Sequence, residues 1–153
     1  HQWVSSYGES HQNPTNKKIH WVCVPFIMLT LLGLLSLVKF NISLNENIYE
    51  LNLSYMLIIL ALIFYLRLSI SISIGMLLIS ALSLFCIYQL QEILSESNLF
   101  FVYIGIFIVA WIGQFIGHKI EGKKPSFFED LQFLLIGPAW LLSFIYKKIG
   151  IKY

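Results

Sequence analysis

Charged residues are scarce in this chain. Asp, Glu, Lys and Arg make up 12% of its 153 residues, and 58% of the residues are apolar. Soluble domains contain about 25% charged and roughly 45–50% apolar residues. So few charges cannot cover the surface of a folded chain in water, and a lipid bilayer is therefore the expected solvent. The net charge of +2 is too small and too scattered to favour nucleic acid binding.

Cysteine is also scarce. Cys23 and Cys86 both lie inside apolar segments, and neither belongs to a CxxC motif. The sequence therefore predicts two buried free thiols and excludes a disulfide framework or a zinc ribbon. No internal repeat or low-complexity linker divides the chain, so we expect a single integral-membrane domain over residues 1–153.

Four apolar segments are the candidate membrane spans. They cover residues 19–38, 51–67, 69–90 and 99–117, and a helix needs about 20 residues to cross roughly 30 Å of hydrocarbon. A polar arm, residues 1–18, precedes them, and polar loops are expected around residues 39–52 and 91–98. The alternating Ser-Ile pattern at residues 69–74 is expected to be helical, because an isolated strand cannot satisfy its backbone in lipid.

The last apolar stretch, residues 127–148, contains Gly137-Pro138 and ends in two lysines. A Gly-Pro pair inside a short apolar stretch favours a re-entrant or in-plane helix pair over a fifth crossing. The expected fold is an all-α membrane protein with about four transmembrane helices and this C-terminal helix pair.

The basic residues indicate an orientation. If four helices cross the membrane from a cytoplasmic N-terminus, nine of the ten Lys and Arg residues lie on the cytoplasmic side and only Lys39 lies opposite. This distribution agrees with the positive-inside rule. The same topology places His11, His20, His118 and Glu121 on the cytoplasmic side at one membrane depth.

Histidine and carboxylate side chains at one depth indicate a metal site. Such ligands suit zinc, iron or manganese, and a mixed set with open positions favours non-haem Fe(II). His118 and Glu121 are three residues apart and share a face if their helix continues. Each histidine is also explained as an interfacial hydrogen-bonding residue, and Glu121 as the partner of a nearby lysine. Whether His1 or Glu129 adds a ligand stays open.

Four further residues near these histidines are expected to contact a substrate, namely Lys17, Asn16, Gln114 and Trp21. Lys17 can attract a carboxylate to the membrane surface. The amides of Asn16 and Gln114 can orient ligand imidazoles, although helix capping explains them equally well. Trp21 is first an interface anchor and second a substrate contact.

Two motifs resemble a known family. Residues 7–25 (YGESHQNPTNKKIHWVCVP) resemble its N-terminal signature, and residues 111–125 (WIGQFIGHKIEGKKP), followed by Gly137-Pro138, resemble its C-terminal signature. The family is that of the small yeast membrane protein named for the metabolism of phytosphingosine to odd-numbered fatty acids. The resemblance covers nearly the whole chain, and the middle segments match in apolarity only. Residues 143–148 depart from the family pattern, since they are apolar or basic where an acidic residue is expected.

The resemblance implies an Fe(II)-dependent dioxygenase of fatty acid α-oxidation. Such an enzyme would convert a long-chain 2-hydroxy fatty acid and O2 to the acid one carbon shorter, with release of CO2. By motif position, the resemblance implies that His11, His20 and His118 are catalytic metal ligands, and Glu121 matches as a further ligand. The expected site is cytoplasmic, in a bacterial inner membrane or an endoplasmic reticulum.

Two other classes of function remain open. A zinc- or iron-dependent lipid hydrolase or hydroxylase could use the same histidines, and the identity of the metal and the dependence on O2 would separate it. A non-enzymatic membrane scaffold or transporter subunit could carry them as structural residues. The lack of charged residues inside the central apolar segments argues against an ion pathway.

Overall fold

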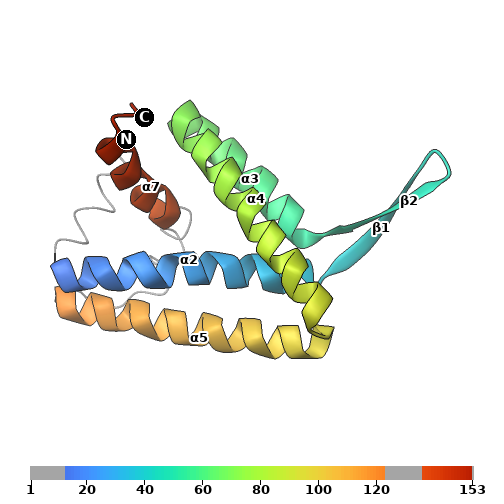
Figure 1. Ribbon diagram of the computed structural model, residues 1–153, viewed down its shortest axis with the longest axis horizontal. Helices are drawn as coiled ribbons and strands as arrows, with labels where there is room; N and C mark the ends of the chain where they lie inside the picture. Colours follow the sequence, from blue (N-terminus) through green and yellow to red (C-terminus); the bar gives the residue numbers. More distant parts are fainter. Residues whose placement is uncertain (1–12, 123–135, 153) are drawn as a thin grey trace.

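The computed structural model describes residues 13–122 and 136–152, which form five helices and one β-hairpin (Figure 1). The predominantly helical prediction is confirmed, whereas the loop expected at residues 39–52 is a hairpin. The elements in chain order are α2 (Pro14–Ser36), β1 (Lys39–Leu44), β2 (Asn47–Asn52), α3 (Leu53–Leu68), α4 (Ile70–Ile93), α5 (Glu96–Glu121) and α7 (Ile136–Ile149).

Helix α2 begins at Pro14, inside the expected polar arm. The side chain of Asn13 caps it, because its Oδ1 accepts hydrogen bonds from the backbone N–H groups of Thr15 at 2.9 Å and Asn16 at 3.4 Å. Pro14 occupies the first turn, where the absence of an N–H costs no helical hydrogen bond. The Asn13-Pro14 pair thus starts the helix, and Asn16 is a buried residue within it.

Helices α2 and α5 lie antiparallel and side by side, and they make the most extensive helix–helix contact in the described part of the chain (Figure 1). Small residues permit this approach. A Cβ added at Gly113 would lie 2.5 Å from Cys23 Sγ, and one added at Gly117 would collide with Asn16 Oδ1. The Gly113-x-x-x-Gly117 spacing on α5 is the pattern that lets membrane helices pack closely.

Helices α3 and α4 pack against each other and cross the α2–α5 pair at an angle (Figure 1). Helix α7 contacts α2 and α4. The Tyr146 hydroxyl of α7 donates a hydrogen bond to the Ser71 carbonyl of α4 at 2.5 Å. Tyr146 also belongs to a buried apolar cluster that includes Tyr65, Met76 and Leu142. The cluster joins α3, α4 and α7 on the side of α2 that faces away from α5.

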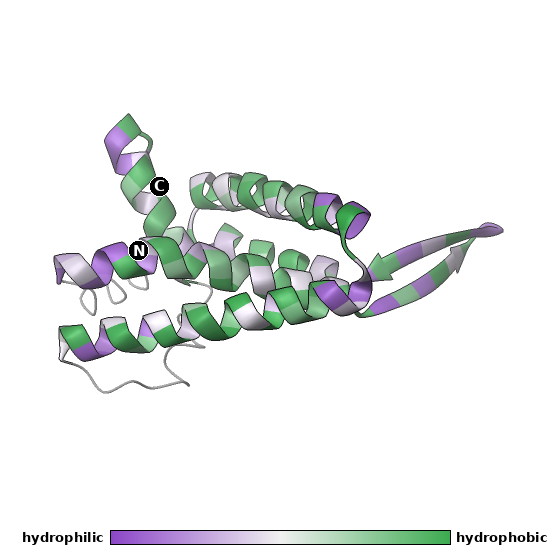
Figure 2. Cartoon of the chain, turned by 60° about the horizontal axis from the view of Figure 1, so that its bottom comes forward, coloured by the Kyte–Doolittle hydropathy of each residue, from purple (hydrophilic) through white to green (hydrophobic). Residues whose placement is uncertain are grey.

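Among the described residues, three helices, α2, α4 and α5, are long and apolar enough to cross a membrane. Figure 2 shows that apolar residues predominate along these helices. Helix α3 is apolar, but its 16 residues extend only about 24 Å. The count of four spans and the cytoplasmic N-terminus stay predictions. The described part of the last apolar stretch is helix α7 (Ile136–Ile149), and Gly137-Pro138 lies at its start. The first member of the expected C-terminal pair falls outside the described residues.

Other boundaries and exposures differ from expectation. The polar loop expected at residues 91–98 is reduced to residues 94 and 95 between α4 and α5. The Ser-Ile stretch is helical, as predicted, and Ser73, Ser80 and Ser83 of α4 are buried. Cys86 is exposed rather than buried, because it lies on a face of α4 that no described helix covers.

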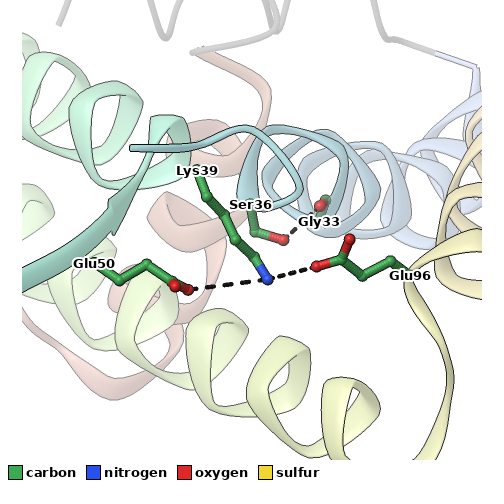
Figure 3. A network of polar contacts seen from close by, with 5 residues as sticks. All are labelled: Gly33, Ser36, Lys39, Glu50 and Glu96. Carbon is green, nitrogen blue, oxygen red and sulfur yellow. Dashed lines mark hydrogen bonds and ion pairs between the residues drawn. The ribbon is translucent and has the colours of Figure 1, made fainter. Parts of the chain in front are cut away.

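The hairpin closes through a two-residue turn. Asn45 and Glu46 have φ values of 48° and 67°, the positive values that type I′ hairpin turns require. At the base of the hairpin, Lys39 Nζ lies 2.6 Å from Glu96 Oε1 and 3.9 Å from Glu50 Oε1 (Figure 3). These ion pairs tie the hairpin to the start of α5, at the end of the α2–α5 pair that is remote from its histidines.

Candidate functional site

Two histidines from the facing helices α2 and α5 form the centre of the site. His20 lies in the second turn of α2, and His118 lies in the last turn of α5. Because the helices are antiparallel, these two ends meet. The ring centroids are 5.9 Å apart and the ring planes are inclined by 88°. The side chains are 1% and 8% exposed, so the two imidazoles face each other away from bulk solvent.

A backbone contact determines which nitrogen of His20 carries the proton. His20 Nδ1 lies 2.9 Å from the carbonyl oxygen of Asn16, one turn earlier on α2. A carbonyl can only accept, so Nδ1–H donates and, in the neutral ring, Nε2 keeps its lone pair. A hydrogen bond of this kind orients imidazoles that bind metals. The arrangement suits Nε2 for coordination.

Two buried amides accompany the histidines. Asn16 is fully buried, and Gln114 of α5 is 6% exposed, one turn before His118. A spacing of four residues places each amide on the same helix face as its histidine. Within the described ranges, Gln114 Oε1 is buried and has no hydrogen-bond donor. An unsatisfied buried acceptor costs about 1–3 kcal/mol, so a bound molecule that donates to it would be stabilised.

Gly117 allows Asn16 and His20 of α2 to approach α5 closely. Its absent side chain leaves room for Asn16 Oδ1, and an added Cβ would also lie 3.4 Å from His20 Cε1. The site therefore depends on the same close approach that joins α2 to α5. Neither glycine of Gly113-x-x-x-Gly117 was singled out from the sequence, although their four-residue spacing is a visible signal.

The other expected substrate contacts lie on different sides of α2. Lys17 is half-buried in the first turns of the helix. Trp21 is 40% exposed, and its ring centroid lies 6.1 Å from that of Phe144 in α7. Trp21 thus faces α7, whereas Asn16 and His20 pack against α5. Nothing in the sequence pattern indicated that the aromatic residues of α7 would meet Trp21.

The remaining expected ligands are not described. His1, His11 and Glu129 lie outside the described residues, as does the side chain of Glu121 at the end of α5. Across residues 13–122 and 136–152, no group of three or more His, Cys, Asp or Glu side chains converges. The described part of the site thus supplies two imidazoles and two amides.

Comparison with known proteins identifies the family. The model of the family described as 2-hydroxy-palmitic acid dioxygenase Mpo1-like matches residues 1–149. The chain belongs to the Mpo1-like family. It is 32% identical over 148 residues to a Saccharomyces cerevisiae protein named 2-hydroxy-palmitic acid dioxygenase MPO1, and the match covers 94% of this chain and 78% of the yeast protein. No solved structure matches.

The family match confirms the resemblance read from the two motifs. It spans both the segment that contains His11 and the segment that contains His118 and Glu121. The structure adds that His20 and His118, which belong to different motifs 98 residues apart in the sequence, lie together between two helices. Their role as ligands stays a prediction.

Proposed function

We propose that this chain is an Fe(II)-dependent dioxygenase of fatty acid α-oxidation. It converts a long-chain 2-hydroxy fatty acid and O2 to the fatty acid one carbon shorter, CO2 and water. The reaction balances without a further reductant, because the substrate itself supplies the four electrons that reduce O2. Membership of the Mpo1-like family and the name of the yeast relative support the substrate class.

The observation that carries the proposal is the pair of buried imidazoles between α2 and α5. Bound nitrogens lie about 2.0–2.1 Å from a metal such as zinc, and two rings whose centroids are 5.9 Å apart are close enough to share one ion. The Nδ1–H of His20 is held by the Asn16 carbonyl, which suits a metal-binding tautomer. The described donors therefore fit the metal that the family resemblance implies.

In this proposal His20 and His118 hold the iron together with His11 from the N-terminal arm and Glu121 from the end of α5. When bound, Fe(II) supplies the redox chemistry with O2 that cleaves the C1–C2 bond of the substrate. The protein keeps the imidazoles oriented and limits access of water, since His20 and His118 are almost fully buried.

The polar head of the substrate is placed by neighbouring side chains. The buried Gln114 Oε1 can accept a hydrogen bond from the 2-hydroxyl group, and its amide N–H groups can donate to the carboxylate. Lys17, half-buried one turn before His20, attracts the carboxylate electrostatically. Asn16 acts through His20, whose ring it orients.

The proposed membrane arrangement brings the substrate to this site from the bilayer. We propose four crossings, made by α2, α3, α4 and α5, with the N-terminus and the metal site on the cytoplasmic side. The distribution of Lys and Arg along the sequence supports this orientation. Because α3 is short, its crossing requires local thinning of the bilayer or snorkelling of the Arg67 side chain to the membrane surface.

The proposal is tested with purified His20→Ala and His118→Ala proteins loaded with Fe(II) under anaerobic conditions. We expect each to lose most of its iron and to lose more than about 100-fold in turnover of 2-hydroxypalmitic acid, since even changes behind the ligands cost 10–100-fold. Iron content and O2-dependent product formation are the measurements. Full iron and full activity in either variant would remove that histidine from the site.

Ser36→Ala is the matched control. Ser36 is buried near the other end of α2 and donates to the Gly33 carbonyl at 2.5 Å, so this change removes a buried polar contact without touching the site. It should keep its iron and its turnover. Bound zinc with turnover that is independent of O2 would favour a hydrolase, and a metal-free native protein that a chelator leaves unchanged would favour a scaffold.

A further inference from the structure

An apolar cavity lies on the side of α2 that faces α7, and Trp21, the residue after His20, is among its lining residues. It has a volume of about 220 Å³ and lies between α2, α4 and α7, with Trp21, Val24 and Met28 on its α2 wall. Val24 is one turn after His20, and it is 2% exposed. The cavity therefore extends along α2 from the depth of the histidine pair toward the middle of the helix.

A second apolar cavity, called the inner cavity below, lies next to the first. Its volume is about 290 Å³, and it lies between α2, α3 and α4, with Ala61, Met76 and Ser80 among its lining residues. Met28 and Pro138 line both cavities, so these two residues lie between the two spaces. Together they form a row of apolar space along the face of α2 that is turned away from α5.

The length of this row matches a long alkyl chain. From Trp21, which lines the first cavity, to Leu32, the last α2 residue that lines the inner cavity, the helix rises about 16.5 Å. A fully extended chain advances about 1.2 Å per bond, as the reach of an extended peptide shows. The distance thus accommodates a chain of about fourteen bonds.

A third apolar space offers a test of this assignment. The groove between α2 and α5 has a volume of about 390 Å³ and is lined by Val22, Phe26, Gly105 and Val109. Val22, Phe26 and Val109 are 60%, 47% and 68% exposed, so the groove is part of the outer surface of the helix pair. The inner cavity is partly open, but it reaches deeper into the protein, since Tyr65 and Met76 among its lining residues are 3% and 2% exposed.

We propose that the alkyl chain of the 2-hydroxy fatty acid lies in the two adjoining cavities on the α3, α4 and α7 side of α2, with its far end between Ala61 and Ser80. The proposal rests on the proposed function, because it takes the head group to be at His20 and His118. Met28 lies where the chain passes from one cavity to the next. The depth of the inner cavity then limits the chain length of the substrate.

Photolabelling tests the position of the chain without any need for turnover. The probe is a 2-hydroxy fatty acid of palmitic length that carries a diazirine at its terminal carbon, added to the full-length protein in phosphatidylcholine nanodiscs. We expect adducts on residues of the inner cavity, such as Ala61 and Met76, and their loss when unlabelled 2-hydroxypalmitic acid competes. Adducts mainly in the Phe26–Val109 groove would overturn the proposal. It would also be overturned if added phosphatidylcholine reduced labelling of the inner cavity as much as 2-hydroxypalmitic acid does.

Filling the inner cavity tests its role in selectivity. Ser80→Leu should lower the ratio of kcat/KM for 2-hydroxypalmitic acid to that for 2-hydroxydecanoic acid by at least about tenfold, because one or two excess methylenes are discriminated by that factor in apolar pockets. Ala61→Leu is a second variant with the same expectation. Gly105→Leu, which fills the outer groove, should leave the ratio unchanged.

The outcomes separate this inference from the proposed function. An unchanged ratio in both cavity variants, with normal melting temperatures, would overturn the cavity assignment even where the wild-type protein turns over 2-hydroxypalmitic acid. Labelling of the inner cavity in a protein that binds iron but shows no O2-dependent turnover would overturn the proposed function and uphold the position of the chain.

Discussion

The two sides of α2 differ in how tightly they pack. Toward α5 the helix meets two glycines, and its contacts include the buried polar side chains of Asn16 and His20. Toward α3, α4 and α7 its contacts are apolar, and two cavities remain between the helices. Around His20, α2 therefore makes a close contact with α5 that includes buried polar side chains, whereas its contacts with α3, α4 and α7 are apolar and leave cavities.

This difference suits the two ends of an amphipathic substrate. A reacting head group requires side chains held within fractions of an ångström, which close packing against Gly117 provides. An alkyl chain requires apolar space and little directional contact. In the proposed enzyme, the side of α2 that faces α5 performs the chemistry, and the opposite side holds the chain.

The largest effect is expected from a change that loosens the close contact. Gly117→Ala places a Cβ against Asn16 Oδ1 and near His20, and Asn16 is fully buried, so the amide cannot move aside without loss of packing. Overpacking of this kind costs about 1–3 kcal/mol. We expect a lower melting temperature, weaker iron binding and at least about tenfold lower turnover.

Gly105→Ala is the matched control for this change. Gly105 lies in the same helix, and a Cβ added there meets no atom within 4 Å. Alanine in a helix is more stable than glycine by about 0.5–1 kcal/mol, so the control should melt slightly higher and keep its activity. If Gly117→Ala behaved like Gly105→Ala in both measurements, the contact between α2 and α5 would not position the site.

Much of this contrast was visible in the sequence, but only on the polar side. Apolar runs predicted the helices, because length and hydropathy are local properties. The histidines could be assigned to one depth from the charge distribution. The pairing of His20 with His118 required knowledge of which helices are neighbours, and no pattern in one sequence provides that.

The errors have physical causes. Asn45 and Glu46 take positive φ values, which polar composition alone does not reveal, so the hairpin was predicted as a loop. The helix pair predicted around Gly137-Pro138 stays a prediction, because only its second part, α7 from Ile136, is described. The cavities depend on side chains from four helices and left no signal in any one segment.

A smaller effect is expected on the loosely packed side. Tyr146→Phe removes the hydrogen bond from α7 to the Ser71 carbonyl and keeps the ring, and the net loss for one such bond is about 0.5–1.5 kcal/mol. The melting temperature should fall by about 2–4 °C, with iron content unchanged. Tyr88→Phe, at a 57% exposed position of α4, should melt like the wild type. Loss of iron in Tyr146→Phe would show that the two sides of α2 are coupled.

The smallest effect is expected at the far end of the α2–α5 pair, where the polar contacts are charged and exposed. The hydrogen bond from Lys39 to Glu96 raises the pKa of Lys39 above its ordinary value of 10.5. The contribution of Lys39 to stability is therefore present at neutral pH and is lost as the pH rises through that higher pKa.

Lys39→Gln should cost about 0.2–1 kcal/mol, the range for solvent-exposed pairs, since the side chains of Lys39 and Glu96 are 37% and 69% exposed. Thermal unfolding at pH 7 in low salt should show a decrease of at most about 3 °C, and 1 M salt should abolish the difference by screening. Lys18→Gln, at an exposed position of α2, is the control for loss of one positive charge. If the melting temperature of Lys39→Gln fell as far as that of Gly117→Ala, the exposed ion pair would stabilise the α2–α5 pair as much as the buried glycine contact does. The two ends of the α2–α5 pair would then not differ in their contribution to stability.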